Sequence, residues 1–340
     1  MTSTTPLLDI RDLTVSFKTD DGLVRAVNGV DLQMFPGETL AVVGESGSGK
    51  SVSAMAVMGL LPSYTQIEGS VEFEGTDLLK LSTRAMRKLQ GNEIAMIFQD
   101  PMTALNPVFT VGNQIIEGIR IHHPQISKQA ARERTIELLA LVGIPEPRQR
   151  VDNYPHEFSG GMRQRAMIAL AIANEPKLLI ADEPTTALDV TIQAQVLEVM
   201  RTAQEATGAA MMLITHDLGL VAGVADRVQV MYGGRVFEMS DTDTIFYRSR
   251  NPYTRGLMTS VPTAAARTDD RLSPIPGAPP SAINPPRGCV FRPRCQHAED
   301  ACYEEPPLLA LDATGRHLSR CHFAEELPEL GAQDELGRSA

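Results

Sequence analysis

The chain has 340 residues, of which 43% are hydrophobic and 21% charged, and its net charge is −11. This composition excludes wholesale disorder and leaves room for one large α/β domain with an appendage. The acidic balance disfavours a nucleic-acid partner, whose phosphates would be repelled on average. No run approaches the ~18 apolar residues that span a bilayer, and the first residues lack the layout of a secretory signal. We therefore expect a soluble, cytosolic protein that reaches a membrane only through a partner.

The first predicted elements are strands that lead to a glycine-rich loop. Leu8–Phe17 alternates apolar and polar residues, which is the period of a half-buried strand. Leu40–Val43 is a continuous apolar run, typical of a buried parallel strand, and it ends at Gly44. Ser51–Gly59 follows as a predicted helix whose N-terminus faces the loop.

The loop between this strand and helix has the spacing G-x-x-x-x-G-K-[ST]. Its glycines let backbone N–H groups approach phosphates, the lysine reaches the β- and γ-phosphates, and the hydroxyl binds Mg²⁺. This pattern alone marks a large class of nucleotide-binding proteins. It predicts a nucleotide and Mg²⁺ site that comprises Gly44, Glu45, Ser46, Gly47, Ser48, Gly49, Lys50 and Ser51.

The character of the sequence changes to helices between Asp100 and Pro155. Ala130–Val142 carries apolar residues on one face, and prolines follow it as stops. A second helix is predicted after Ser159 and ends before Pro176. Its apolar face has helical spacing and consists of Met162, Ala166, Ala169, Leu170 and Ala173.

Polar side chains stand at the ends of three further apolar runs. Gln99 follows the run that ends at Phe98, Asp182 and Glu183 end the run from Leu178, and His216 ends the run from Met211. The carboxyl ends of parallel strands are where α/β sheets bind ligands. The sequence therefore predicts functional side chains at these four positions.

The segment from Phe158 to Arg165, read as FSGGMRQR, resembles the signature of ATP-binding cassette (ABC) proteins. The resemblance implies a P-loop α/β fold: a RecA-like core, an antiparallel β subdomain and an inserted helical subdomain. In that family the Ser-Gly-Gly turn closes on the ATP of a second cassette. It thus implies a dimer in which Ser159, Gly160 and Gly161 contact the partner's nucleotide.

The same resemblance implies roles for the residues at the strand ends. Asp182 is expected to hold Mg²⁺ together with Ser51 and Gln99, while Glu183 is the general base that polarises the attacking water. His216 is expected to contact the γ-phosphate. Taken alone, adjacent carboxylates can cap a helix and a strand-end histidine can be an ordinary hydrogen-bonding group. The order of the motifs along the chain favours the nucleotide site.

Two more residues are assigned to the nucleotide site by resemblance. Phe17 occupies the place of the aromatic that stacks on adenine in this family, although an aromatic at a strand end can equally belong to the core. Asp189 ends the segment Pro184–Asp189, which is similar to the family's D-loop.

Three segments resemble the ATPase subunits of dipeptide and oligopeptide importers, namely Asp100–Pro107, Asn251–Leu257 and Pro286–Cys295. This resemblance implies a protein at the cytoplasmic face of the membrane with a companion ATPase, identical or related, and two transmembrane permeases. An extracytoplasmic binding protein would deliver the peptide. It also implies that Gln99–Pro107 receives a coupling helix of a permease.

Alternatives to peptide import remain open at this stage. Related systems carry nickel, glutathione or other solutes, and the ATPase itself does not touch the cargo. A soluble ABC ATPase of DNA repair or translation usually has paired cassettes, coiled-coil insertions or basic zinc modules, which this sequence lacks. A P-loop kinase or GTPase should lack the Ser-Gly-Gly turn.

The predicted domains follow from these segments. Residues 1–240 form the ABC nucleotide-binding domain, with a helical subdomain inserted at about 100–176. An extended, proline-rich linker at 241–288 is followed by a four-cysteine module at 289–323. The acidic residues 324–340 are expected to be a mobile tail.

The only four cysteines of the chain are Cys289, Cys295, Cys302 and Cys321. Clustered cysteines in a cytosolic protein point to metal binding or to chance burial. Four thiolates can hold a zinc ion or a [4Fe–4S] cluster. The resemblance to peptide-importer ATPases favours the cluster. Zinc and the absence of a metal remain alternatives. Zinc would be favoured if a nearby histidine replaced one of the cysteines as a ligand, and the candidates are His297, His317 and His322.

Overall fold

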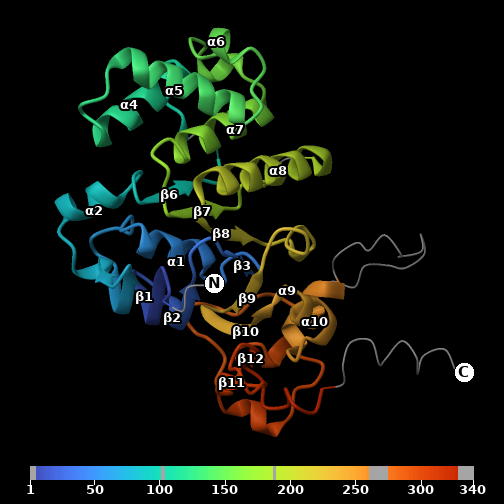
Figure 1. Ribbon diagram of the computed structural model, residues 1–340. Coiled ribbons are helices and arrows are strands. Elements are labelled where there is room, and N and C mark those ends of the chain that lie inside the picture. The colour runs from blue at the N-terminus through green and yellow to red at the C-terminus, as the bar shows by residue number, and fades with distance from the viewer. Residues whose placement is uncertain (1–4, 101–103, 187–188, 260–274, 328–340) are drawn as a thin grey trace, which may run out of the picture. The chain divides into compact units, whose positions relative to one another are not determined.

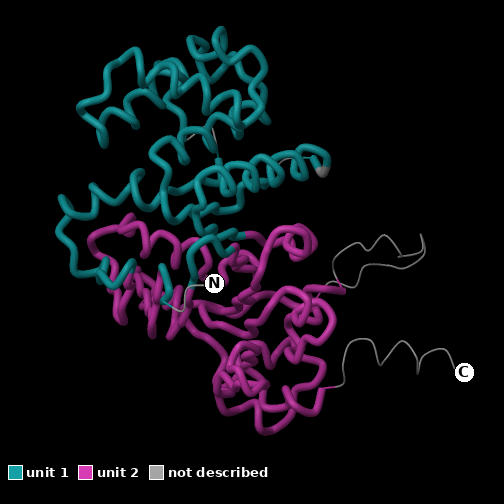
Figure 2. Tube along the Cα trace, in the orientation of Figure 1, with its two compact units in different colours: residues 1–7, 34–38, 73–214 teal, residues 8–33, 39–72, 215–340 magenta. Residues whose placement is uncertain are grey.

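The computed structural model describes residues 5–100, 104–186, 189–259 and 275–327 (Figure 1). The chain divides into two compact units, which Figure 2 distinguishes and which are described in turn below. The first unit consists of residues 1–7, 34–38 and 73–214, and the second of residues 8–33, 39–72 and 215–340. Within the described residues, no helix has both the length and the apolar character needed to cross a membrane.

Three parallel strands form the centre of the first unit: β6 (Ile94–Ile97), β7 (Leu178–Asp182) and β8 (Ala210–Thr215). The strand β7 pairs with both neighbours, so that Leu178 lies opposite Ile94 on one side and Ala210 on the other. Every residue of the three strands is buried, as continuous apolar runs require. The strands predicted around Leu178 and Met211 are confirmed. The unit also contains β5 (Thr76–Asp77), the short helix η1 (Leu78–Lys80) and α2 (Thr83–Leu89).

The helices between β6 and β8 account for most of the first unit (Figure 1). The helices α4, α5 and α7 pack against one another, and α7 also packs on α8 and β6. Thr110, Ser127 and Ser159 cap α4, α5 and α7 by accepting a backbone N–H of the first turn. The bounds are α4 (Val111–His122), α5 (Lys128–Leu141), α6 (Pro147–Arg150), η2 (Pro155–Glu157), α7 (Gly160–Ala171) and α8 (Val190–Thr207).

Both helices predicted in this region are present, but α7 ends earlier than the sequence suggested. It stops at Ala171, five positions before Pro176. The reason is a turn in which Ala173 N–H donates to the Leu170 carbonyl and Glu175 adopts the left-handed backbone conformation, with φ of 53°. A residue in that conformation cannot continue a right-handed helix.

The second unit contains two groups of strands. In one, β1 (Leu8–Thr19) lies between β2 (Gly22–Met34) and β4 (Gln66–Phe73). In the other, β3 (Thr39–Val43) pairs in parallel with β9 (Arg227–Tyr232), which forms an antiparallel hairpin with β10 (Arg235–Asp241). The helix α1 (Lys50–Val57) follows β3, and the short helix η3 (Leu218–Leu220) precedes β9. The predicted sequence of strand, glycine loop and helix is confirmed.

The range 241–288 was predicted to be an extended linker, and this is wrong for its first part. Two helices occupy it, α9 (Thr242–Arg248) and α10 (Pro252–Thr259). Asp241 caps α9 by accepting the N–H of Thr244, and the Asn251 side chain accepts the N–H of Tyr253 at the start of α10. These polar side chains satisfy the first N–H groups of the helices. Residues 275–288 contain neither helix nor strand, and residues 260–274 lie outside the described range.

The C-terminal region continues the second unit. It contains the short helices η4 (Arg292–Arg294) and η5 (Asp300–Tyr303) and the short strands β11 (Leu309–Ala310) and β12 (Leu318–Ser319). The strand β12 pairs with β10, so that Ser319 lies opposite Glu238 and Leu318 opposite Met239. The predicted mobile tail begins at residue 324, yet Ala324 and Leu327 are buried. Residues 328–340, the rest of that range, lie outside the described residues.

Candidate functional site

The glycine loop of the second unit is packed against the β9–β10 hairpin. A Cβ atom on Gly44 would stand 2.1 Å from the Met231 carbonyl oxygen, so only glycine fits there. Gly49 has φ of 100°, and a Cβ on it would stand 2.5 Å from the Ala26 carbonyl. Gly234 N–H in the hairpin turn donates to the Ser48 carbonyl at 3.1 Å. The loop is therefore held by backbone contacts that larger residues would prevent.

Lys50 begins α1 and reaches back over the loop. Its Nζ donates to the carbonyl oxygens of Gly44 at 2.7 Å and Glu45 at 3.0 Å, and to Ser48 Oγ at 3.4 Å. These contacts close the loop into a ring around the lysine. The N-terminal end of α1 and the positive charge of Lys50 both favour an anion at this place.

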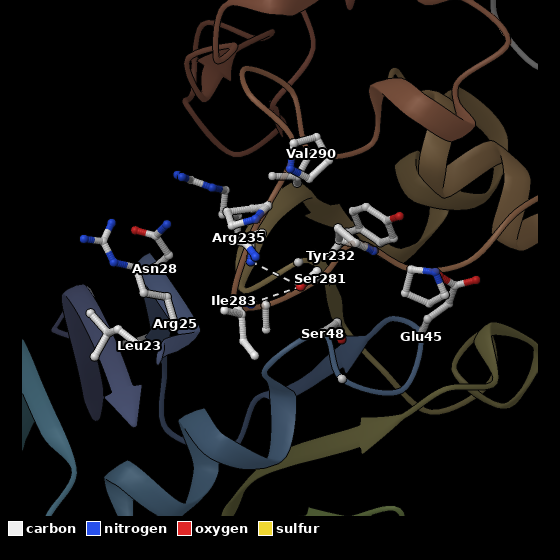
Figure 3. Close-up of a pocket in the computed structure, with 18 of the residues that line it drawn as sticks. Leu23, Arg25, Asn28, Glu45, Ser48, Tyr232, Arg235, Ser281, Ile283 and Val290 are labelled. Atoms are coloured by element: carbon white, nitrogen blue, oxygen red, sulfur yellow. Dashed lines mark hydrogen bonds between the residues drawn. The ribbon is translucent and has the colours of Figure 1, made fainter. Parts of the chain in front are cut away.

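A cavity of about 670 Å³ lies beside the loop within the second unit. Glu45 and Ser48 of the loop line it together with Arg25 of β2 and Ser281 of the proline-rich segment (Figure 3). Arg25 N–H donates to the Ala282 carbonyl at 3.3 Å. C-terminal residues thus line a cavity next to the phosphate-binding loop.

The carboxylates at the end of β7 form the centre of the first unit's polar site. Asp182 is the last residue of the strand and is buried. Glu183 follows with φ of 47°, the left-handed conformation that is strained for a side-chain-bearing residue. Its Oε2 accepts from Gln99 Nε2 at 3.1 Å and from Thr186 Oγ1 at 2.9 Å. The structure therefore brings together Gln99 and Glu183, two of the predicted site residues, and adds Thr186.

The signature segment is connected to the same carboxylate loop. Gln164, buried in α7, donates from Nε2 to the Pro184 carbonyl at 2.6 Å. Ser159 caps α7, and a Cβ on Gly160 would meet nothing within 4 Å. Ser159 and Gly160 are exposed. The N-terminus of α7 is thus accessible, as a surface that contacts another molecule must be.

The remaining predicted residues lie on the elements expected. Phe17 is half-buried in β1, and His216 is exposed directly after β8. Both belong to the second unit. Asp189 caps α8 by accepting the N–H of Ile192 at 3.0 Å. Ala187 and Leu188 of the D-loop segment, and residues 101–103 of the segment after Gln99, lie outside the described range.

Sequence reasoning missed two residues that hold the loop in the second unit. Arg294 forms an ion pair with the Glu45 side chain, and the Tyr253 hydroxyl accepts the Glu45 backbone N–H at 2.9 Å. The hydrogen-bonded Glu45 raises the pKa of Arg294, and burial raises the pKa of Tyr253. No sequence signal connects positions 249 residues apart.

All four cysteines line one small cavity of about 20 Å³, together with Phe291 and Arg320. Burial raises the pKa of Cys289, and it raises the pKa values of Cys295 and Cys321 to about 11. Among the described residues, no group of three or more His, Cys, Asp or Glu side chains is arranged to hold a single metal ion. Cys302 is buried and the other three cysteines are half-buried, so the four thiols are gathered at one place that is only partly open to solvent.

Comparison with known proteins gives the same picture as these motifs. Residues 27–186 match the family described as ABC transporter, and residues 237–302 match the oligopeptide/dipeptide transporter C-terminal region. The oligopeptide transport ATP-binding protein OppD of Bacillus subtilis is 53% identical over 318 residues, which cover 92% of this chain and 88% of that protein. This chain belongs to the family of ABC ATP-binding proteins of oligopeptide and dipeptide transporters.

Other relatives of the oligopeptide and dipeptide family agree. OppD of Mycobacterium bovis is 53% identical over 97% of this chain, and DppD of Bacillus subtilis, a dipeptide transport ATP-binding protein, is 51% identical over 87%. The chain spans about half the length, 54%, of the mycobacterial relatives it matches. Among solved structures, the ATP-binding cassette MJ0796, a dimer in a post-hydrolysis state with ADP and Pi, is 25% identical with a TM-score of 0.62. The aligned region covers 69% of this chain and 98% of the MJ0796 chain. The predicted P-loop ABC fold with its additional C-terminal region is confirmed.

Replacing Gly44 tests how closely the ABC loop is packed. We expect Gly44→Ala to lower the free energy of unfolding by about 1–3 kcal/mol, because the new methyl group would overlap the Met231 carbonyl. Gly223→Ala is the control, since a Cβ there meets nothing within 4 Å, and it should change stability by less than about 0.5 kcal/mol. Urea denaturation measures both, and equal stabilities would show that the loop is not packed in this way.

Proposed function

We propose that the protein is the ATP-hydrolysing subunit of an importer for oligopeptides or dipeptides. The observation that carries the proposal is the Glu183 carboxylate, held by Gln99 and Thr186 directly after the buried Asp182. Family membership supports the proposal, because the relatives are named as oligopeptide and dipeptide transport ATP-binding proteins. Import of nickel, glutathione or another solute by the same machinery is the alternative cargo.

The roles of the residues follow the order of the motifs. Lys50 and the amides of residues 44–51 would bind the phosphates of ATP, with Phe17 stacking on adenine and His216 contacting the γ-phosphate. Ser51, Gln99 and Asp182 offer the oxygen ligands that Mg²⁺ prefers and would hold it. When bound, Mg²⁺ supplies positive charge that stabilises the phosphate oxygens.

Glu183 would act as the general base for hydrolysis. The water oxygen bonds to the γ-phosphorus, the bond from that phosphorus to the ADP oxygen breaks, and the water proton passes to the Glu183 carboxylate. The products are ADP and phosphate. The hydrogen bonds from Gln99 and Thr186 orient the carboxylate before the reaction, which reduces the cost of reorganisation.

A second cassette, identical or related, would complete each site. The accessible N-terminus of α7, with Ser159, Gly160 and Gly161, suits the phosphate of a nucleotide held by another subunit, and Asp189 would lie at the same junction. MJ0796, which has the same fold, was solved as a dimer with ADP and Pi. ATP would hold two cassettes together, and loss of the γ-phosphate contacts would release them.

Two transmembrane permeases would be the membrane partners, and an extracytoplasmic binding protein would supply the peptide. The protein would then lie at the cytoplasmic face of the membrane. Large apolar side chains flank the segment after Gln99: Phe98 is 41% exposed, Val108 69% and Phe109 51%. A group of exposed apolar side chains can mark an interaction surface, and these three lie close in sequence, so this segment suits a coupling helix of a permease.

The four-cysteine module would hold a [4Fe–4S] cluster, with zinc as the alternative. All four cysteines line one cavity, and in a [4Fe–4S] cluster each thiolate binds a different iron. A zinc ion would need at least three of the ligands to move together around one ion, because the described side chains are not arranged in that way. Cys289, Cys295, Cys302 and Cys321 would ligate it. The cluster would fix a region that has only short secondary structure elements, as metals do in small modules.

The general-base assignment is tested with Glu183→Gln in the assembled transporter. The amide keeps the shape but cannot take the proton, so phosphate release should fall on the order of 10²–10⁴-fold while ATP still binds. Glu137→Gln, the same change on an exposed side chain of α5, should leave the rate unchanged. Near-normal turnover of Glu183→Gln would remove Glu183 from this role.

The docking segment is tested with the double variant Val108→Asp and Phe109→Asp. Burial of each apolar side chain contributes about 1.5–3 kcal/mol, so the charged variant should no longer co-purify with the permeases, although the isolated chain still binds ATP. Tyr247→Asp is the control, on a side chain that is 70% exposed in α9. Undiminished recovery of the double variant with the permeases would contradict docking at this segment.

The cluster is tested by anaerobic purification. A [4Fe–4S] cluster predicts a brown protein with about four irons and four sulfides per chain. Cys302→Ser should lose the iron, and His297→Ala should keep it. A colourless protein with one zinc per chain would establish the alternative, and one without metal would contradict both.

A further inference from the structure

Glu45, the second residue of the phosphate-binding loop, is held by an arginine from the C-terminal region. Arg294 donates from two nitrogens to the two carboxylate oxygens of Glu45, at 2.5 and 2.9 Å. The Arg294 side chain is only 5% exposed, and that of Glu45 is 26% exposed. A two-bond pair of this kind fixes the direction of both side chains, and shielding from water strengthens it.

Arg294 is itself fixed by partners other than Glu45. Its guanidinium donates to the carbonyl oxygens of Pro276 at 2.9 Å and Ile275 at 3.2 Å, and to the Tyr232 hydroxyl at 3.1 Å. The Tyr232 ring also lies beneath it, 5.7 Å away. These contacts with Pro276, Ile275 and Tyr232 hold the Arg294 guanidinium directed toward the loop.

The backbone of Glu45 has a second contact with the same region. Its N–H donates to the hydroxyl of Tyr253, a fully buried side chain of α10. The Tyr253 ring packs against Tyr232, with centroids 4.5 Å apart, and against Phe291, 5.3 Å apart. Cys289 and Cys295 pack against the hydrophobic core cluster that contains these rings. Side chain and backbone of Glu45 are thus both held by residues beyond 250.

Glu45 also lies next to the group that meets the phosphates. The Lys50 ammonium donates to the Glu45 carbonyl. The carboxylate and the N–H of Glu45 thus contact the C-terminal region, and its carbonyl accepts from Lys50 and from the Ser48 N–H of the loop. Glu45 therefore stands between the C-terminal residues and Lys50, in direct contact with both.

We propose that Arg294 is a positioning residue that holds the phosphate-binding loop in the conformation that accepts ATP. The C-terminal region, which lies outside the matched cassette segment 27–186, thereby takes part in nucleotide binding. This inference rests on the proposed ATP binding at the loop. The expected effect depends on the fraction of molecules whose loop has the conformation that accepts ATP. If that fraction falls to a tenth, the apparent Kd for ATP rises tenfold.

The test is the Kd for Mg·ATP of the full chain, measured by calorimetry. Arg294→Gln should weaken binding about tenfold, and Arg294→Lys, which keeps the charge but not the two-bond geometry, should fall between Arg294→Gln and the wild type. Arg292→Gln is the matched control, because Arg292 lies on the same short helix and stacks on Tyr303 instead. It should bind ATP like the wild type.

A double-mutant cycle with Glu45→Gln separates positioning from general damage. If Arg294 acts through Glu45, each single variant should weaken binding about tenfold and the double variant no further. Thermal unfolding without nucleotide shows whether each variant is folded. An unchanged Kd for a folded Arg294→Gln protein, or independent effects of the two substitutions, would overturn the proposal.

Failure of the proposed function gives a different result. A wild-type chain that does not bind Mg·ATP, or a Lys50→Ala variant that binds it as tightly as the wild type, would contradict ATP binding at this loop and with it the proposal. Wild-type binding that Lys50→Ala abolishes and Arg294→Gln leaves intact would overturn the role of Arg294 alone.

Discussion

The close packing of the glycine loop on the β9–β10 hairpin is the constraint on which the second unit depends. The Met231 carbonyl leaves no room for a side chain at Gly44, and the Gly234 amide holds the Ser48 carbonyl. With the backbone fixed at both places, Lys50 can reach back across the loop and satisfy three acceptors. The fixed backbone therefore orients the amide N–H groups of the loop before a ligand binds. In many other anion sites side chains provide the hydrogen-bond donors instead.

In the first unit, the main feature is the Glu183 carboxylate, which is held in one orientation at the end of β7. Glu183 accepts the strain of a left-handed backbone, and in that conformation its N–H donates to the Ile214 carbonyl of β8. Two hydrogen bonds then direct its carboxylate. Because Gln164 of the signature helix contacts the adjacent Pro184 carbonyl, a displacement of α7 would be felt at the carboxylate loop within the same unit.

The parts that sequence predicted well are those where local pattern and tertiary structure agree. Buried parallel strands such as β7 and β8 are continuous apolar runs, and the P-loop spacing admits few other geometries. The helices α9 and α10 were not predicted because the many prolines of the range 241–288 indicate an extended chain. Asp241 and Asn251, which are good capping residues, are the sequence signal that indicates the two helices. The pairing of Arg294 with Glu45 could not be read at all. The pair forms only because the fold brings together positions 249 residues apart. The residues around Glu45 and those around Arg294 contain no pattern that indicates the contact.

The pairing of β12 with β10 has a consequence for how the cassette can be produced. The strand β10 carries the fully buried Glu238, which lies opposite Ser319 in the strand pairing and whose carboxylate contacts Ser249 and His317. A chain cut after α10 would retain every ATP motif but would expose this strand edge to solvent, with an acidic side chain deprived of His317. Unprotected edges pair with one another between molecules. In the full chain β12 covers this edge, so the C-terminal region protects β10 from strand pairing of this kind.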